Sequence, residues 1–223
     1  MNNKTSVIAI DGPAASGKST VASLVAKRLN IPYINTGNMY RAITYFFIKN
    51  DIDFENINFS DLKTLLNSIS LKYVETHDDG FALSLNEKIL GSEIRSPEVA
   101  QQVSRVAKNP VVREVMTSLQ REYGQQHLVV MEGRDIGSVV FPNAKYKFFV
   151  MASPLIRAQR RLNQSGETFS DATLESVVAE ITARDKIDME REIAPLKQAD
   201  DAILVDTSEL TIDQVVEKII SYI

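Results

Sequence analysis

The chain has 223 residues, of which 44% are hydrophobic, and this is enough apolar material to fill the interior of one large domain. It contains no cysteine, which excludes a disulfide framework and a thiolate metal site. The net charge of -4 excludes a general electrostatic attraction of the surface to nucleic acids or membranes. No run approaches about 18 apolar residues, so we expect a cytoplasmic protein. Because the net charge is negative, we expect any anionic ligand to be bound by a local group of residues.

Apolar runs typical of strands alternate with amphipathic runs typical of helices along most of the chain. Such alternation predicts a parallel sheet between two helical layers, so we expect an α/β fold with three layers, α/β/α. Serine or asparagine followed by proline marks helix starts at 96–97, 109–110 and 153–154. In chain order the pattern predicts strands at 7–10, 33–34, 128–131, 146–151 and 202–205, helices that begin at Lys18, Asn38 and Pro154, and a last helix at 212–222.

Two segments break this alternation. Residues 71–90 alternate between apolar and polar positions, with polar turns at 77–80 and 86–87, and this predicts a small antiparallel β insertion. Residues 163–173 are polar and include a glycine between two helical patterns, which is typical of a mobile surface flap.

The loop after the first strand carries the most specific motif. Residues 12–19 read GPAASGKS and fit the pattern G-x-x-x-x-G-K-[ST] at every position. The glycines let backbone N–H groups point at phosphate oxygens, and the next helix directs its positive end to the same place. Lys18 would then contact the β and γ phosphates of a nucleoside triphosphate, and the Ser19 hydroxyl would ligate Mg²⁺. GTPases, ATPase motors and kinases share this loop, so other residues must decide between them.

Other residues predict a second phosphate group close to the first. Thr36 and Arg41, at the start of the helix after the second strand, form a small candidate anion site. Glu132 ends an apolar strand, where a carboxylate can order water on Mg²⁺. The helical faces that border the flap carry Arg157 and Arg161 on one side, and Arg184, Asp188 and Arg191 on the other.

These features together favour phosphoryl transfer between two bound molecules. A flap that carries arginines can close over the phosphates, exclude water and neutralise charge. The two histidines, His77 and His127, fit neither a hydrolase triad nor a metal centre and are interpreted as structural. Three alternatives stay open: a kinase of another acceptor such as UMP, AMP or shikimate, a nucleotide-dependent switch that signals through residues 71–90, and an RNA-binding protein, which the net charge disfavours.

Six segments follow one another as IDGPAASGKST, NTGNMYRA, EIRSPEVAQQVSRVAKNPVVRE, EGRDIGSVVFPNA, RAQRR and ARDKIDMEREIAPL. In this order they resemble the bacterial cytidylate kinases, which transfer the γ-phosphate of ATP to CMP or dCMP. The resemblance runs from about Val7 to the C-terminus and implies ATP and Mg²⁺ as cofactors and CMP and dCMP as substrates. We expect a monomer that binds neither nucleic acid nor membrane.

The resemblance also implies a P-loop NTPase fold in three parts. The core would comprise about 1–35, 108–155 and 195–223, the acceptor-binding segment with the β insertion about 36–107, and the lid about 156–194.

Individual residues receive roles from the same resemblance. Gly12, Pro13, Ala14, Ala15, Ser16, Gly17, Lys18, Ser19 and Thr20 would bind the ATP phosphates, with Arg157 against the adenine and Arg161 near the phosphates. Arg41, Arg134 and Arg184 would hold the CMP phosphate, Asp188 and Arg191 the ribose, and Ser104, Arg113 and Asp135 the cytosine, while Thr36 and Tyr40 would also contact CMP. The catalytic residues would be Lys18, Arg134, Arg157, Arg161 and Arg184, with Ser19 and, through water, Glu132 on Mg²⁺.

The chemistry of cytosine supports the assignment of its readers. Cytosine offers an N4 amino donor and acceptors at N3 and O2, which suit a carboxylate or hydroxyl on one side and an arginine on the other. Uracil reverses the pattern at N3 and position 4, so UMP should be a markedly poorer acceptor.

Two positions depart from the pattern of the family. Asn35 stands where an aspartate is common, and Glu132 stands where an aspartate is usual. Both keep a polar oxygen, so the departures concern the fine geometry of the metal site and leave the expected activity in place.

Overall fold

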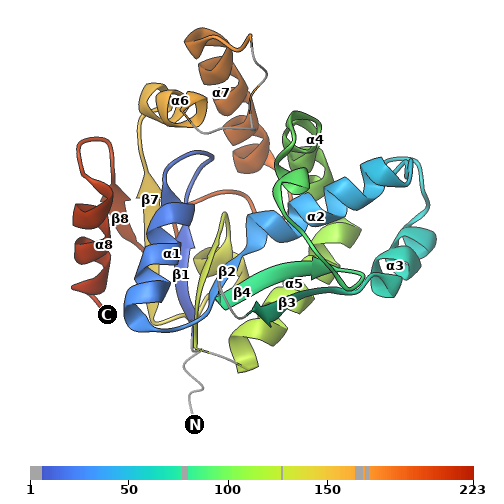
Figure 1. Ribbon diagram of the computed structural model, residues 1–223, viewed down its shortest axis with the longest axis horizontal. Coiled ribbons are helices and arrows are strands. Elements are labelled where there is room, and N and C mark those ends of the chain that lie inside the picture. The colour runs from blue at the N-terminus through green and yellow to red at the C-terminus, as the bar shows by residue number, and fades with distance from the viewer. Residues whose placement is uncertain (1–6, 77–79, 127, 164–167, 169–170) are drawn as a thin grey trace.

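Five parallel strands form the central sheet of the protein, whose computed structural model describes residues 7–76, 80–126, 128–163, 168 and 171–223. His77, His127, residues 77–79 of the turn predicted at 77–80 and most of the predicted flap lie outside these residues. The strands lie in the order β2-β6-β1-β7-β8 (Figure 1), and every pair is parallel. Their bounds are β1 Val7–Asp11, β2 Tyr33–Asn35, β6 Val129–Gly133, β7 Tyr146–Met151 and β8 Ile203–Asp206.

Alternate residues of β1 belong to two different hydrophobic cores. Ile8 and Ile10 pack in the core that includes α1 (Lys18–Leu29) and α8 (Ile212–Ile220). Val7 and Ala9 belong to the core that includes α2 (Thr36–Lys49) and α5 (Pro110–Gln126). This is the two-residue period of a strand that is buried on both faces. The expected α/β fold with three layers is therefore confirmed, and its layers can be followed in Figure 1.

The predicted antiparallel insertion is also present. It comprises β3 (Leu71–Thr76), β4 (Gly80–Leu85) and β5 (Lys88–Ile89), with β4 between the other two. Asn86 and Glu87 have φ values of 47° and 68°, as a tight hairpin turn requires. Its buried leucines join the same core as α2, which fixes the insertion on one side of the sheet.

The remaining helices lie around the carboxyl ends of the strands and beside the insertion. The helix starts predicted at Pro97, Pro110 and Pro154 are all observed. Close to the end of the sheet lie α6 (Pro154–Leu162) and α7 (Leu174–Glu190), which Figure 1 shows beside each other. They pack through a small core of Ala158, Val177 and Ile181. The other helices are α3 (Phe59–Ser68), the 3₁₀ turn η1 (Ser92–Arg95), α4 (Pro97–Lys108) and the π-helical turn η2 (Ile136–Val140). Among the residues described, no helix is both long and apolar enough to cross a membrane.

Two element boundaries differ from the prediction in a way that matters for the site. The helix expected from Asn38 begins at Thr36, because the side chain of Asn35 accepts a hydrogen bond from Asn38 N at 2.9 Å and caps it. The strand expected at 128–131 continues to Gly133, because its pairing with β1 extends to Asp11. Glu132 is therefore held in a paired strand and not in a turn.

Candidate active site

A cavity of about 710 Å³ opens at the carboxyl ends of the parallel strands, where ligands bind in open α/β sheets. Its wall combines the loop after β1, the ends of β2 and β6, two residues after β8, and residues of α1, α2, α6, α7 and α8. The predicted site residues that line it are Ala14, Ala15, Ser16, Gly17, Lys18, Ser19, Thr20, Arg41, Glu132, Arg134, Arg161 and Arg184. Those that do not line it are Gly12, Pro13, Thr36, Tyr40, Ser104, Arg113, Asp135, Arg157, Asp188 and Arg191.

Two glycines shape the phosphate loop. A Cβ atom on Gly12 would lie 2.0 Å from the main-chain oxygen of Val150, so no larger residue fits there. Gly17 caps α1 with a φ of 87°, a value that glycine adopts without strain. Because α1 begins at the next residue, the free N–H groups of its first turn open toward the cavity, as a phosphate site requires.

Lys18 is buried at the start of this helix. Its Nζ donates a hydrogen bond to the main-chain oxygen of Pro13 at 3.0 Å. Burial, followed by the positive charge of Arg134, lowers the pKa of Lys18 to about 7. Both causes disfavour the ammonium form. An anion bound in the cavity would act in the opposite direction and favour the protonated, charged form of Lys18.

Six arginines line the cavity together with Lys18, and Arg41, Arg134 and Arg184 are three of them. Burial, followed by the charges of Arg134 and Arg41, lowers the pKa of Arg184 to about 9. The Nε atom of Arg184 is buried and has no hydrogen-bond partner in the part of the chain that the structure describes. Arg134 Nε donates to Asp188 Oδ2 at 2.9 Å, which supplies part of the compensating charge. Converging guanidinium groups with an unsatisfied buried donor are suited to bind a phosphate.

Glu132 contributes the acidic group of the wall. Tyr33 Oη donates to Glu132 Oε1 at 2.8 Å, whereas Oε2 is buried and has no hydrogen-bond partner among the described residues. Ser19 lines the same cavity. Carboxylate and hydroxyl oxygens are ligands that Mg²⁺ prefers, so the unpartnered Oε2 and the serine fit this ion or its bound water. Thr36 Oγ1 donates to the main-chain oxygen of Glu132 at 2.7 Å and so fixes the strand end from outside the wall.

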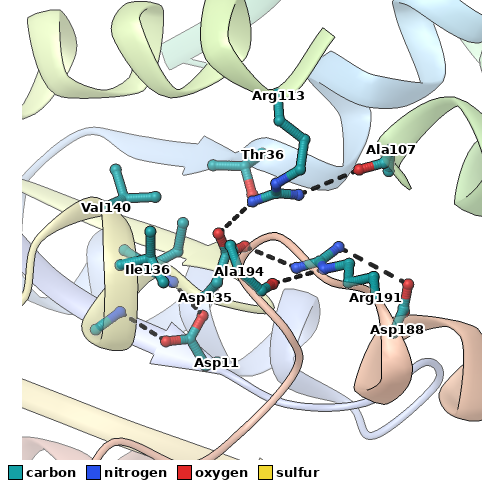
Figure 2. A network of polar contacts seen from close by, with 12 residues as sticks. Asp11, Thr36, Ala107, Arg113, Asp135, Ile136, Val140, Asp188, Arg191 and Ala194 are labelled. Atoms are coloured by element: carbon teal, nitrogen blue, oxygen red, sulfur yellow. Dashed lines mark hydrogen bonds and ion pairs between the residues drawn. The ribbon is translucent and has the colours of Figure 1, made fainter. Parts of the chain in front are cut away.

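The predicted readers of cytosine form a buried network of their own, which Figure 2 shows. Arg113 forms an ion pair with Asp135 Oδ2, and Arg191 Nη2 lies 3.2 Å from Asp135 Oδ1. Arg191 also lies 3.9 Å from Asp188, which links the network to Arg134 at the cavity wall. Ser104 is buried on α4, and the ring of Tyr40 lies under the guanidinium of Arg113, 5.7 Å from its centre. The structure thus brings Arg113, Asp135 and Arg191 together, but Asp135 forms ion pairs with both arginines.

Asp11 does not line the cavity but holds the turn that follows Asp135, a role that the sequence did not predict. Its two carboxylate oxygens accept hydrogen bonds from Ile136 N at 2.8 Å and Gly137 N at 2.7 Å (Figure 2). Burial raises its pKa to about 7, against the lowering effect of these two donors. Asp11 therefore ties the end of β1 to the turn that follows Asp135. In the sequence, only its position one residue before the phosphate loop indicated that Asp11 could lie near the site.

The arginines of α6 have three different environments. Arg157 is buried in contact with Asp185 and the main-chain oxygen of Ala14, so it holds the phosphate loop, and its place against adenine stays a prediction. Arg161 lines the cavity and pairs with Glu180 at 2.9 Å. Arg160, to which no role was given, also lines the cavity, and its Nη1 donates to the main-chain oxygen of Ser16 at 3.3 Å. The other cavity residues that were missed include Tyr33, Asn38, Arg95 and Thr207.

Comparison with known proteins gives a consistent result. The family model for cytidylate kinase matches residues 8–223. The cytidylate kinase of Clostridium botulinum strain Loch Maree is 47% identical over 216 residues, which cover 97% of this chain and 96% of that protein. The cytidylate kinase of Clostridioides difficile is 45% identical over 217 residues and covers 97% of both. That of Bacillus cereus is 45% identical over 216 residues, which cover 97% of this chain and 95% of the relative.

Solved structures share the fold at much lower identity. A crystal structure of shikimate kinase from Bacteroides thetaiotaomicron has a TM-score of 0.51 and 14% identity, and the match covers 97% of each chain. An uncharacterized protein from Eubacterium ventriosum has a TM-score of 0.54 and 16% identity, over 97% of this chain and 96% of that one. At such identities the likeness supports the fold alone.

Proposed function

The chain belongs to the cytidylate kinase family, and on this basis we propose that it transfers the γ-phosphate of ATP to CMP or dCMP, which yields ADP and CDP or dCDP. One observation carries the proposal: a single cavity combines a phosphate loop with Arg41, Arg134 and Arg184, and the buried Nε of Arg184 has no hydrogen-bond partner among the described residues. The loop would hold the triphosphate of ATP, and the arginines would hold the phosphate of the acceptor. A nucleotide-dependent switch has no use for the second of these two sites.

The reaction asks mainly for alignment and charge compensation. An oxygen of the CMP phosphate attacks the γ-phosphorus in line, the bond from this phosphorus to the β–γ bridging oxygen breaks, and ADP leaves with the electron pair. The attacking phosphate is already anionic, so no general base is required. Lys18 and Arg161 would compensate the charge on the side of ATP, while Arg41, Arg134 and Arg184 would hold the acceptor phosphate.

Mg²⁺ would neutralise part of the phosphate charge when it is bound with ATP. We propose that Ser19 ligates the ion and that Glu132 contacts it through water. The unpartnered Oε2 of Glu132 and the position of Ser19 on the same wall support this assignment.

We propose that Ser104, Arg113 and Asp135 read the cytosine, and that Asp188 and Arg191 hold the ribose. Arg113 and Asp135 contact each other in the structure, so the base would replace a contact that both residues now make. The N4 amino group of cytosine can donate to the carboxylate, and N3 or O2 can accept from the arginine. Uracil has an N–H at N3 and an acceptor at position 4, and it would leave both buried side chains mispaired.

We further propose that the chain works as a monomer in the cytoplasm, where free nucleotides are available. The division into a core, an acceptor-binding segment at about 36–107 and a lid at about 156–194 is part of the same proposal. The small core between α6 and α7 supports a lid that moves as one body, because it is separate from the two cores that flank the sheet.

A coupled ADP-release assay tests the function directly. The chain is incubated with ATP and Mg²⁺, and each of CMP, dCMP, UMP and AMP is added in turn. We expect rapid ADP formation with CMP and dCMP and much slower formation with UMP and AMP. If the rate of ADP formation were the same in the presence and in the absence of an acceptor, the proposal would be refuted and a nucleotide-dependent switch would be favoured.

A further inference from the structure

The hydroxyl of Tyr33 lies between Asn35 and Glu132 on the wall of the cavity. It donates to Glu132 Oε1 at 2.8 Å and accepts from Asn35 Nδ2 at 3.0 Å. Tyr33 and Asn35 are two residues apart on β2 and therefore point to the same face of the sheet. The register of the sheet pairs Asn35 with Glu132 on the neighbouring strand β6. Backbone pairing thus brings the three side chains together at one edge of the phosphate site.

The direction of each hydrogen bond follows from the chemistry of its partners. Asn35 Oδ1 accepts from Asn38 N at 2.9 Å, so the amide nitrogen is the group that faces Tyr33. The single proton of the phenol then points to the carboxylate, which cannot donate. A phenol ordinarily loses its proton only at about pH 10, so Tyr33 keeps this proton at neutral pH.

Glu132 needs such a partner more than an aspartate would. A glutamate has one more rotatable bond than an aspartate, and holding it in one orientation costs more side-chain entropy. A charge-assisted hydrogen bond from Tyr33 to Oε1 offsets that cost. It leaves Oε2 buried beside the cavity, where no residue that the structure describes provides a hydrogen bond.

The main chain of Asn35 is also held in place. Tyr73, from the first strand of the β insertion, accepts a hydrogen bond from Asn35 N at 3.1 Å and donates to Asn35 O at 2.8 Å. The amide that supports Tyr33 therefore sits on a fixed backbone.

We propose that Tyr33, supported by Asn35, is a positioning residue that orients the carboxylate of Glu132 toward a magnesium ion bound with ATP. This inference rests on the proposed function and deepens it. An aspartate at position 35 would still cap α2, but it would offer Tyr33 an acceptor in place of a donor and draw the phenol proton away from Glu132.

The test is the effect of Mg²⁺ on nucleotide binding, measured by calorimetry with a non-hydrolysable ATP analogue. Each protein is titrated once with Mg²⁺ and once with EDTA, and the ratio of the two affinities is the magnesium gain. In Tyr33→Phe, which removes only the hydroxyl, we expect the magnesium gain to fall about tenfold, as for other residues that orient a metal ligand. The affinity in EDTA should stay at the value of the parent. A magnesium gain equal to that of the parent would overturn the proposal.

Tyr146→Phe is the matched control. It removes a hydroxyl that donates to Ile223 O at 2.7 Å, on another strand of the same sheet and away from the cavity. This variant should keep the full magnesium gain. A loss as large as that of Tyr33→Phe would mean that any missing phenol hydroxyl has this effect, and it would also overturn the proposal.

Asn35→Ser provides a second route that does not depend on the folding of Tyr33→Phe. The change removes the amide donor to Tyr33 without adding charge, and the serine hydroxyl can accept from Asn38 N, so the helix cap is retained. We expect its magnesium gain to fall in the same direction, and an unchanged gain would count against the proposal. The proposed function is judged separately: a parent chain that shows the Tyr33-dependent magnesium gain but phosphorylates no nucleotide would refute the function and keep the positioning role.

Discussion

Arg157 of α6 and Asp185 of α7 form a buried ion pair, with 2.6 Å between Nη1 and Oδ2, beside the phosphate loop. The same two side chains bind both backbone groups of Ala14: Arg157 donates to its oxygen at 3.0 Å, and Asp185 accepts from its N–H at 3.3 Å. The pair therefore joins the two helices of the predicted lid to the loop that would hold ATP.

Breaking this pair should destabilise the protein strongly. Asp185→Asn leaves the guanidinium of Arg157 buried without its counter-charge, and we expect the free energy of unfolding to fall by about 3–5 kcal/mol. In the double variant Arg157→Met, Asp185→Leu no charge is left unpaired, so its loss should be smaller than the sum of the losses in the single variants Arg157→Met and Asp185→Leu. Urea unfolding of the parent, these two single variants and the double variant measures this coupling. Strictly additive losses would show that the two residues act independently.

The parts of the fold and the site that the sequence predicted are those that local rules determine. Each position of the phosphate loop is set by the backbone of one short segment, so its spacing alone located Lys18 and Ser19 on the cavity wall. The α/β architecture followed from the order of apolar runs. The predicted ends of strands and helices were less accurate, because pairing with β1 extends β6 to Gly133 and a side-chain cap starts α2 at Thr36.

Local sequence patterns could not predict the ion-pair and hydrogen-bond partners of charged residues, because these partners come from distant parts of the chain. Arg157 and Arg161 share a helical face, yet of these two only Arg161 lines the cavity. Arg157 instead forms an ion pair with Asp185 and a hydrogen bond with the main-chain oxygen of Ala14. Asp11 had no visible role until the fold brought the turn after Asp135 against it. The contact of Tyr33 with Glu132 likewise depends on the register between two strands that are far apart in sequence.

ATP binding should be accompanied by proton uptake at Lys18. Its pKa is lowered to about 7 in the free protein, so above that pH most molecules carry the neutral amine. A bound phosphate favours the charged form and raises the pKa, so the complex takes up a proton from the buffer. Calorimetric titrations in buffers of different ionisation enthalpy measure this uptake. It should vanish in Lys18→Met, and binding enthalpies that do not depend on the buffer would contradict the prediction.

Asp11→Asn should loosen the turn that follows Asp135. Both oxygens of Asp11 accept backbone hydrogen bonds, and an asparagine would place an NH₂ group against one of the two donors. We expect a loss of about 1–3 kcal/mol in the free energy of unfolding and a larger rise in KM for CMP than for ATP. Glu114→Gln is the matched control, because its exposed carboxylate pairs with Lys63 at the surface and should contribute little. Equal effects of the two variants would argue against the role of Asp11.

Asp135→Asn should reduce the preference for CMP over UMP. The carboxylate can only accept, which suits the N4 amino group of cytosine, whereas an asparagine amide can also donate to the oxygen at position 4 of uracil. We expect the ratio of kcat/KM for CMP to that for UMP to fall by about 10- to 100-fold. Asp135 also pairs with Arg113 and Arg191, so the variant will lose stability as well. That loss acts on both substrates alike and cancels in the ratio, so a ratio equal to that of the parent would mean that the base is read by other residues.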